Sequence, residues 1–321
     1  MTNLAITGSS AGGDPGRGNV PPDVSIIIVS YGTRDLTLAC LESIVQQTNA
    51  VRYEVLVVDN ASPDDSVEAI AEKYPQFRLF AQSDNLGFAA ANNLAARHAH
   101  GEYFLLLNPD TLVLDHAVDN LVAFARRRPA AGIWGGRTLF GNRSLNPTSC
   151  WQRQTLWNLF CRGTGLAMVF RNSPIFHSEG YGGWKRDSER PVDVVTGCLL
   201  LITRALWDRL EGFAPEFFMY GEDADLCLRA RSFGYRPAIT PEATIVHYGG
   251  ATETNNARKA KRLLAAKALL IRKHFPAAAR PLALIFLASK PFLKRLISSG
   301  KERSNWREVW AVRTQWLAGK F

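Results

Sequence analysis

Apolar runs of strand length alternate with amphipathic segments over the first 110 positions of the chain. The runs are residues 24–30, 53–58, 77–81 and 103–107. Between them, apolar side chains recur every three or four positions, as at Leu36, Cys40 and Ile44, which is the spacing of one helix face. Strand and helix thus alternate four times, as in a parallel sheet with right-handed crossovers. We expect an α/β domain with a mostly parallel central sheet flanked by helices.

Three parts of the chain differ in character. Residues 1–22 are rich in glycine and proline without periodicity, and they predict a disordered tail. Residues 23–250 hold the alternating pattern, with strand character returning at 192–202 and 239–248 after an irregular stretch. Residues 251–321 are basic with helical spacing, and they predict a C-terminal helical extension.

Composition limits the class of protein. The 321 residues are 46% hydrophobic and 21% charged, which is typical of a globular chain with a sizeable core. The five cysteines are widely spaced and form no CxxC pair, which argues for reduced thiols in a cytosolic compartment and against a zinc site. We expect no signal peptide and no membrane span, since no run reaches the ~18–20 apolar residues that a span requires.

The net charge of +9 belongs to the C-terminal extension. Residues 251–321 carry 16 basic and 3 acidic groups, a balance of +13, against −4 for the first 250 residues. With Trp306, Trp310 and Trp316, this charge is typical of a helical tail on an anionic membrane. Nucleic-acid binding is another use of such charge, but no recognition motif accompanies it. A helical pair that packs on the main domain is the third interpretation.

Polar residues follow the apolar runs where the strands are expected to end. Because ligands bind at the carboxyl ends of strands in open α/β sheets, Asp110 is a candidate metal ligand. Asp59 is placed to accept hydrogen bonds from a ribose or a base. Each residue also fits a plain turn or cap. No Gly-x-Gly-x-x-Gly follows the first run, which argues against a dinucleotide-binding domain.

A second group of polar residues begins at Glu222, after an aromatic run. Glu222, Asp223 and Asp225 stand at the start of a predicted helix, where capping alone would explain three acids. An apolar wall would instead desolvate them and raise the pKa of one, as a general base near neutral pH requires. Upstream, Thr196 and Gly197 interrupt a predicted strand, and a glycine there often marks a ligand or backbone that passes closely.

Together these segments resemble family 2 glycosyltransferases, most closely the bacterial rhamnosyltransferase-type subgroup. The segments are residues 24–32, 57–62, 85–89 with Asn92 and Asn93, and 106–110. The resemblance implies a GT-A domain over residues 23–250, with a nucleotide-binding half (23–110) and an acceptor half (111–250). It also implies a divalent cation, Mg or Mn, on an Asp-x-Asp-type motif. Here that motif is Asn108-Pro109-Asp110, so Asp110 is the only carboxylate that it supplies.

The resemblance also implies roles for single residues. Asp223 corresponds to the catalytic base of inverting members, and Glu222 stands beside it. Asp110 and His247 would share the cation, although a hydrogen bond from His247 to a phosphate is the alternative. The donor-binding residues would be Ser30, Tyr31, Asp59, Asn85, Gly87, Asn93 and Asn108. The acceptor or sugar side would hold Thr196, Gly197 and Asp225, and for Glu222 and Asp225 bracing of the loop is the alternative.

We therefore expect an inverting glycosyltransferase that moves a sugar, best matched by L-rhamnose from dTDP-rhamnose, to a hydroxyl of a glycan or lipid-linked glycan in cell-surface polysaccharide synthesis. A UDP- or GDP-sugar donor is the alternative, and a sugar nucleotidyltransferase or sugar-nucleotide-binding protein is the non-transferase alternative. The expected partners are the nucleotide-sugar and a polyprenyl-diphosphate-linked acceptor, without nucleic acid. We expect a cytoplasmic protein, and the basic tail suggests peripheral contact with the anionic inner membrane at its cytoplasmic face.

Overall fold

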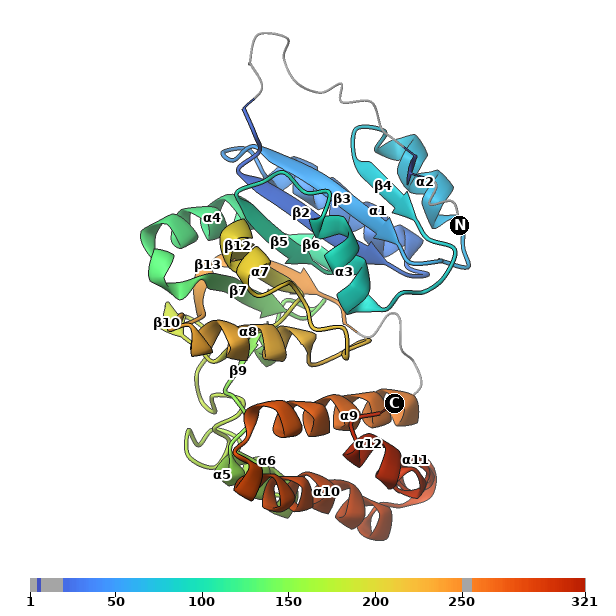
Figure 1. Ribbon diagram of the computed structural model, residues 1–321, viewed down its shortest axis with the longest axis vertical. Coiled ribbons are helices and arrows are strands. Elements are labelled where there is room, and N and C mark those ends of the chain that lie inside the picture. Colours follow the sequence, from blue (N-terminus) through green and yellow to red (C-terminus); the bar gives the residue numbers. More distant parts are fainter. Residues whose placement is uncertain (1–4, 7–19, 250–255, 321) are drawn as a thin grey trace.

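The computed structural model in Figure 1 describes residues 5–6, 20–249 and 256–320. Most of the tail predicted for residues 1–22 therefore lies outside the described residues. Ala5–Ile6 form β1, which pairs antiparallel with β4 (Arg78–Ala81). A single sheet forms the centre of the main domain, with its strands in the order β1-β4-β3-β2-β5-β12-β7-β13-β10.

The four strands that follow β1 in the sheet order are parallel to one another, as predicted. β2 (Val24–Ser30) lies between β3 (Tyr53–Asp59) and β5 (Tyr103–Leu107), and β4 lies beyond β3. All three pairings are parallel, and the register joins Ser30 to Asp59 and Ile28 to Leu107. The crossover helices are α1 (Arg34–Gln47), α2 (Ser66–Lys73) and α3 (Phe88–Ala96). This arrangement brings the ends of β2, β3 and β5 to one edge.

The second half makes the sheet mixed instead of mostly parallel. β12 (Leu199–Thr203) runs antiparallel between β5 and β7 (Ile133–Leu139), and β13 (Ala238–His247) pairs parallel with β7. The short strands β6 (Thr111–Val113), β8 (Leu145–Asn146) and β10 (Arg190–Pro191) add antiparallel pairings.

The prediction of one strand over residues 192–202 is wrong. The segment divides into β12 and β11 (Val194–Val195), and β11 pairs with β9 (Cys150–Trp151) in a separate two-stranded sheet. The division falls at Thr196, whose hydroxyl donates to the carbonyl oxygens of Thr148 and Ser149 at 3.0 and 3.1 Å. The backbone N–H of Thr196 also donates to the Ser149 carbonyl oxygen at 3.1 Å. Backbone and side chain thus hold Thr196 to the residues before β9, and the chain turns at Gly197.

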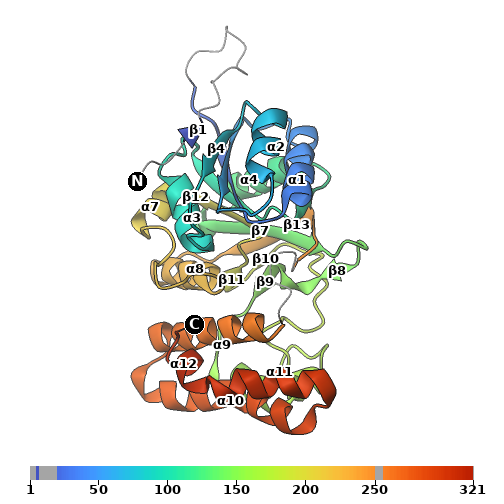
Figure 2. The same cartoon turned by 90° about the vertical axis from the view of Figure 1, so that its right-hand side faces the viewer.

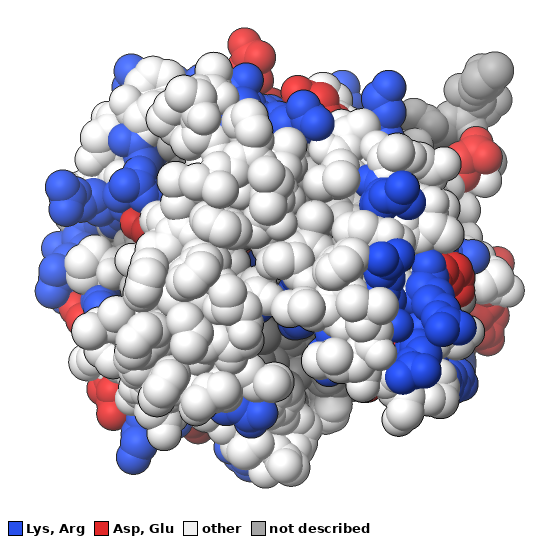
Figure 3. Space-filling model, turned by 90° about the horizontal axis from the view of Figure 1, so that it is seen from below, with Lys and Arg blue, Asp and Glu red and all other residues white. Residues whose placement is uncertain are grey.

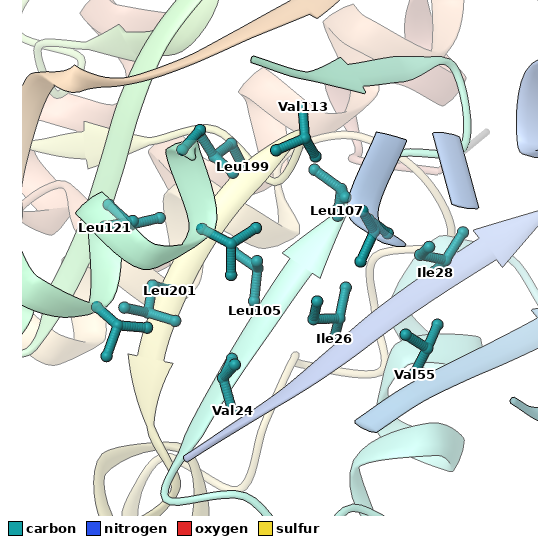
Figure 4. Close-up of a cluster of buried hydrophobic side chains, with 14 of the residues drawn as sticks. Val24, Ile26, Ile28, Val55, Leu105, Leu107, Val113, Leu121, Leu199 and Leu201 are labelled. Carbon is teal, nitrogen blue, oxygen red and sulfur yellow. The ribbon is translucent and has the colours of Figure 1, made fainter. Parts of the chain in front are cut away.

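Helices cover both faces of the sheet, because alternate residues of each strand point to opposite sides. On one face, α1 and α4 (Ala117–Arg127) pack on Val24, Ile26 and Ile28 of β2 and on alternate residues of β5, as Figure 4 shows for Leu105, Leu107 and Leu121. On the other face, α3, α7 (Arg204–Arg209) and α8 (Glu222–Ser232) pack on the intervening residues. Burial on both faces explains the uninterrupted apolar runs.

The helical extension is confirmed, and it includes an internal segment that sequence reasoning left irregular. The C-terminal helices are α9 (Asn256–His274), α10 (Arg280–Ile297), α11 (Gly300–Ala311) and α12 (Arg313–Leu317). α5 (Leu156–Thr164) and α6 (Leu166–Val169) lie beside α10, away from the sheet (Figures 1 and 2). Leu159 of α5 packs with Ala268, Ile271, Ala283 and Leu287 of α9 and α10. We call α5, α6 and α9–α12 the helical unit.

Two tryptophans of the C-terminal helices, Trp310 and Trp316, pack against neighbouring helices of the helical unit. Trp316 is fully buried and donates from Nε1 to the carbonyl oxygen of Val309 at 2.8 Å. Trp310 is partly buried between the rings of Phe292 and Trp316. These two rings hold α10, α11 and α12 together. Short 3-10 turns complete the described chain at Pro129–Ala131, Pro147–Ser149 and Ala277–Ala279. Within the described ranges, every helix is too short or too polar to cross a membrane.

Candidate active site

A cavity of roughly 1660 Å³ lies where the strand ends meet the helical unit. Its upper wall comes from the loops after β2 and β5 and from the start of α8, with Tyr31, Asp110 and Asp223 among the lining residues. Its lower wall comes from α5, α9 and α10. The cavity therefore combines the predicted nucleotide-binding edge with a wall that belongs to the C-terminal extension.

The register between β6 and β13 brings Asp110 and His247 together. Thr111 pairs with His247 across these antiparallel strands, so the residue before β6 lies beside the last residue of β13. The Nε2 atom of His247 is 3.2 Å from Oδ1 of Asp110. The other oxygen of Asp110 accepts a hydrogen bond from the backbone N–H of Gly249 at 3.0 Å. Two residues 137 positions apart in sequence thus form one polar group at the cavity wall.

Charge at this pair favours a protonated imidazole. Burial alone would lower the pKa of His247, but Cys198 and the Asp110 carboxylate outweigh it and raise that pKa to about 10. Asn108 joins the group, since its Nδ2 atom lies 3.3 Å from His247 Nε2. Asp110, His247 and Asn108 all line the cavity.

This pair fits a divalent cation whose other ligands come from a substrate. One carboxylate and one imidazole converge, and the Nδ1 atom of His247 is buried without a hydrogen-bond partner. Over the described part of the chain, three or more His, Cys, Asp or Glu side chains never gather as a metal site. Mg²⁺ is commonly held by one or two carboxylates together with substrate phosphates, and an imidazole nitrogen also suits Mn²⁺.

Glu222 and Asp223 open α8 at the cavity wall. Gly221, with φ +88°, turns the chain into the helix. One oxygen of Asp223 accepts from the Gly197 N–H at 3.0 Å, and the other accepts from the Ala224 N–H at 2.7 Å. Glu222 is almost fully buried, and its Oε2 atom has no hydrogen-bond partner.

The surroundings raise the pKa of both carboxyls. For Glu222, burial and the neighbouring Asp223 charge raise the pKa to about 8. Burial also raises the pKa of Asp223, against the stabilising N–H of Gly197. Two adjacent carboxyls that share a desolvated site hold one proton between them at neutral pH. The arrangement can therefore accept a proton from a hydroxyl group in the cavity.

Asp225 has a different environment, and it does not line the cavity. Its carboxylate is fully buried and pairs with Arg229 at 2.7 Å, His274 at 2.9 Å and Lys273 at 3.3 Å. Although burial would raise its pKa, His274 and Arg229 lower it to about 2. The structure thus places Asp225 as a brace between α8 and α9, which was the alternative to a contact with the acceptor.

Of the seven predicted donor residues, three line the cavity, one lies next to its wall, and three lie away from it. Tyr31, Asn85 and Asn108 line the cavity, and so does Asn60, which sequence reasoning did not select. Asn60 donates to Asn85 Oδ1 at 3.0 Å and accepts from the Leu86 N–H at 2.8 Å, so the two amides hold the loops after β3 and β4 together. Asp59 lies just behind this wall. Its Oδ2 atom accepts a hydrogen bond from the Ser62 N–H, and its Oδ1 atom is buried without a hydrogen-bond partner.

Three other predicted donor residues lie away from the cavity. Ser30 is enclosed, with its hydroxyl 2.9 Å from that of Thr37. Gly87 has φ +79°, and a Cβ there would lie 2.5 Å from the Phe218 carbonyl oxygen, so packing requires this glycine. Asn93 uses its amide on the backbone N–H and carbonyl of Phe213, at 2.9 and 2.8 Å. On the acceptor side, Thr196 and Gly197 both line the cavity.

Basic residues of the helical unit form the part of the cavity that sequence reasoning missed. Arg162, Lys267 and Lys290 line it around one buried carboxylate, Glu179. Lys267 Nζ lies 2.7 Å from Glu179 Oε1, and Arg162 pairs with the other oxygen. Burial and the nearby Arg162 lower the pKa of Lys267 to about 8. Three cations thus face one anion.

Comparison with known proteins establishes the family. The profile of glycosyl transferase family 2 matches residues 25–189, and the chain belongs to this family. It resembles the bacterial rhamnosyltransferases within it. It is 30% identical over 210 residues to the N-acetylglucosaminyl-diphospho-decaprenol L-rhamnosyltransferase of Mycobacterium tuberculosis, which covers 60% of this chain and 66% of the relative. Rhamnosyltransferase WbbL of Escherichia coli is 27% identical over 239 residues, which cover 70% of this chain and 83% of WbbL.

A longer relative and two solved structures complete the comparison. The O-antigen biosynthesis protein RfbC of Myxococcus xanthus is 29% identical over 252 residues, 76% of this chain but 18% of that protein. The chain thus spans less than two thirds of the length of RfbC and of the mycobacterial rhamnosyltransferase. A mannosyltransferase of Pyrobaculum calidifontis, solved with GDP-Man and Mn²⁺, superposes with a TM-score of 0.55 at 20% identity, over 94% and 86% of the chains. Residues 1–349 of TarS of Staphylococcus aureus superpose with a TM-score of 0.53 at 16% sequence identity. The match covers 92% of this chain and 81% of that one. The GT-A fold is confirmed.

Proposed function

We propose that this chain is an inverting, metal-assisted glycosyltransferase that moves L-rhamnose from dTDP-rhamnose to a hydroxyl of a lipid-linked glycan in cell-surface polysaccharide synthesis. One observation carries the proposal. A carboxyl pair with raised pKa values, Glu222 and Asp223, and the Asp110–His247 pair line the same cavity. A base and a site for a diphosphate are the two requirements of transfer from a nucleotide-sugar.

Asp223 is the proposed base. Its two oxygens are fixed by the N–H groups of Gly197 and Ala224, so the carboxylate has one orientation toward the cavity. The acceptor hydroxyl oxygen attacks the anomeric carbon while its proton passes to Asp223. The bond from the anomeric carbon to the diphosphate oxygen breaks on the opposite face, and the bonding electrons leave with the nucleoside diphosphate. Glu222, protonated at neutral pH, keeps the pair at a single negative charge.

Asp110 and His247 are the proposed residues for the diphosphate. A divalent cation bound there would neutralise the charge that develops on the leaving group. Without a cation, the imidazolium of His247 holds the positive charge at this place. Binding of the cation through Nε2 would displace that proton. Asp110 keeps the ring oriented through the 3.2 Å contact. Asn108 contributes its amide from the same loop.

The nucleoside would lie at the ends of β2 and β3. The unpartnered Oδ1 of Asp59 is an acceptor that a base N–H or a ribose hydroxyl can satisfy. Tyr31 is exposed at the cavity wall and offers a ring for stacking, while Asn60 and Asn85 shape the floor. These groups do not separate deoxythymidine from uridine, so a UDP- or GDP-sugar is the alternative donor.

A diphosphate-linked acceptor would suit the lower wall. Arg162, Lys267 and Lys290 leave an excess of positive charge around Glu179, which matches a second diphosphate. The Mycobacterium tuberculosis relative is named for an N-acetylglucosaminyl-diphospho-decaprenol acceptor. Because such an acceptor resides in a bilayer, we also propose that this chain acts on the cytoplasmic side of a membrane and contacts it peripherally.

A transfer assay tests the function. The protein is incubated with Mn²⁺, a synthetic N-acetylglucosaminyl-diphospho-polyprenol and each of dTDP-rhamnose, UDP-sugars and GDP-sugars, and the glycolipid product is measured. The substitution Asp223→Asn is expected to abolish transfer and leave donor binding within a few-fold. Binding without transfer by the unchanged protein would indicate a sugar-nucleotide-binding protein. Formation of nucleotide-sugar from a sugar phosphate and a nucleoside triphosphate would indicate a nucleotidyltransferase.

A further inference from the structure

α10 is apolar on two opposite sides. Ala283, Leu287 and Pro291 are buried on the side that meets α5 and α9. The opposite side carries a second row of large apolar residues, which recur at spacings of one, three and seven, as one face of a helix requires: Leu282, Ile285, Phe292, Leu293 and Leu296. All five are exposed, Ile285 by 63%, and Ile297 beside them is exposed by 72%. An amphipathic helix needs only one apolar side to pack on its own protein.

The exposed row continues onto α6 and the loop after it. Met168, Val169, Phe170 and Ile175 are all exposed, Val169 by 70%. A chain of ring contacts, from Phe176 through Trp157 and Phe160 to Phe286, joins this loop to α10. We call the exposed apolar residues of α6, the loop to Ile175 and α10 the lower face. Ten of the twenty large apolar residues that are exposed in the described chain belong to the lower face, and such a gathering of exposed apolar side chains marks an interaction site.

The charge around the lower face is predominantly positive, although Lys294 pairs with Glu302 of α11 at 3.0 Å. Residues 156–178 and 275–301 contain no Asp or Glu. Their basic residues are Arg162, Arg171, Arg280, Lys290, Lys294, Arg295 and Lys301. Figure 3, seen from below, shows a broad uncharged centre with Lys and Arg gathered toward its edges and few Asp or Glu. Apolar side chains surrounded by cations match the acyl boundary and the anionic headgroups of a bilayer.

A second copy of this chain matches the lower face less well. A symmetric pair would place the basic edge of one copy against the basic edge of the other, without carboxylates in these segments to compensate. Anionic lipid supplies the opposite charge directly.

The lower face also adjoins the cavity. Phe286, Leu287, Lys290 and Pro291 of α10 line the cavity from the side opposite to Asp223. One helix therefore separates the cavity from the lower face, and Lys290 belongs to both the cavity wall and the basic edge. A lipid whose tail lies in the bilayer could enter with its headgroup next to this lysine.

We propose that the lower face docks on a membrane that contains anionic lipid, with α10 lying in the plane of the interface. The expectation from sequence placed the membrane contact on the basic C-terminal tail as a whole, and the proposal moves it to the lower face. The basic residues at the start of α9, among them Lys259 and Arg262, line the cavity, and Lys261 is buried against Glu308 of α11. The proposal deepens the peripheral contact proposed above, but it does not depend on sugar transfer.

The test is co-sedimentation with vesicles of phosphatidylcholine alone or with phosphatidylglycerol. The full chain is expected to bind the phosphatidylglycerol vesicles, with binding that weakens as salt is added. The triple variant Val169→Ser, Ile285→Ser, Ile297→Ser is expected to lose about tenfold or more in partition coefficient. The matched control replaces exposed apolar residues elsewhere, Val20→Ser, Val45→Ser and Phe233→Ser, and should bind as the unchanged protein does.

Two outcomes would overturn the proposal. One is equal vesicle binding by the triple variant and the control, or no binding by the unchanged chain. The other is a dimer in solution that only the triple variant abolishes, because a second copy would then cover the lower face. Transfer to a water-soluble acceptor analogue is measured in parallel. Vesicle binding without transfer would contradict the proposed activity and support the docking. Transfer without vesicle binding would support the proposed activity and contradict the docking.

Discussion

Gly197 donates its backbone N–H to the carboxylate of Asp223 at 3.0 Å, across the point where β11 and β12 separate. The strand break and the proposed base are therefore parts of one arrangement. A continuous strand through residues 196 and 197 would direct this N–H to a strand partner.

Lengthening the base by one methylene should separate proton transfer from binding. In Asp223→Glu, the carboxylate no longer meets the N–H groups of Gly197 and Ala224 in the same position. We expect kcat to fall about 100-fold, since displacement of a reacting group by about 1 Å has effects of this size. Donor affinity, measured by calorimetry, should stay within a few-fold. The exposed Asp208→Glu is the control, and an unchanged kcat in Asp223→Glu would reject Asp223 as the base.

Glu222 should make the protein less stable as the pH rises. Its pKa is raised from 4.5 to about 8, so between these values the folded protein holds a proton that the unfolded chain has released. The free energy of unfolding therefore falls as pH rises through this window. Glu222→Gln removes this titrating group. The free energy of unfolding of the unchanged protein should therefore fall by at least ~1 kcal/mol more between pH 5 and pH 8.5 than that of the variant.

Urea denaturation at the two pH values measures this difference. The exposed Glu72→Gln is the control and should follow the unchanged protein. Parallel pH profiles for Glu222→Gln and the unchanged chain would contradict the raised pKa.

Asp225 should matter for stability before it matters for substrate binding. Its carboxylate is buried among Arg229, Lys273 and His274, and Asp225→Ala leaves these cations uncompensated. We expect a loss of about 3 kcal/mol or more at pH 7 by urea denaturation. Because the pKa is lowered from 3.8 to about 2, the stabilisation is present above pH 3.8 and is lost as pH falls through 2. A variant of full stability with a raised acceptor KM would instead indicate an acceptor ligand.

Cation binding should depend on both partners of the Asp110–His247 pair. We expect Asp110→Asn and His247→Gln each to weaken Mn²⁺ binding about tenfold or more in the presence of dTDP, as measured by calorimetry. A chelator should stop transfer by the unchanged protein. Asp208→Asn serves as the control. Full transfer after metal removal would reject the cation.

Lys290 should act on the acceptor and not on the donor. In Lys290→Gln, the excess charge around Glu179 falls by one. We expect the KM for a diphosphate-linked acceptor to rise about fivefold, with the KM for the donor unchanged. Lys185→Gln, also exposed but outside the cavity lining, is the control. An equal rise in both KM values would indicate a general loss of folding.

The elements that sequence predicted well are those whose signal is local. Continuous burial on two faces produces the apolar runs of β2, β3 and β5, and the residues that follow these strands meet at one edge in any parallel sheet. For this reason Tyr31 and Asp110 could be selected before their positions were known. Asp223 was selected from the acid group after an aromatic run and from the family resemblance, and all three residues line the cavity.

The elements that sequence missed depend on contacts between distant segments. Glu179 meets Lys267 across 88 positions, and Asp225 meets His274 across 49. No periodicity encodes such pairs. Asn93 and Gly87 look like ligand residues by motif, but their roles are fixed by Phe213 and Phe218 far along the chain. The antiparallel insertion of β12 likewise follows from pairing partners and not from its composition.

The chain enters the helical unit twice, first as α5 and α6 and again as α9 to α12, and Leu159 packs among residues of α9 and α10. A boundary drawn at residue 250 is therefore a division of sequence and not of space. A chimaera made there would bring in foreign α9 and α10 while retaining the native α5 that must fit against them. Successful exchange of acceptor preference among relatives should require residues 152–187 to travel together with the C-terminal helices.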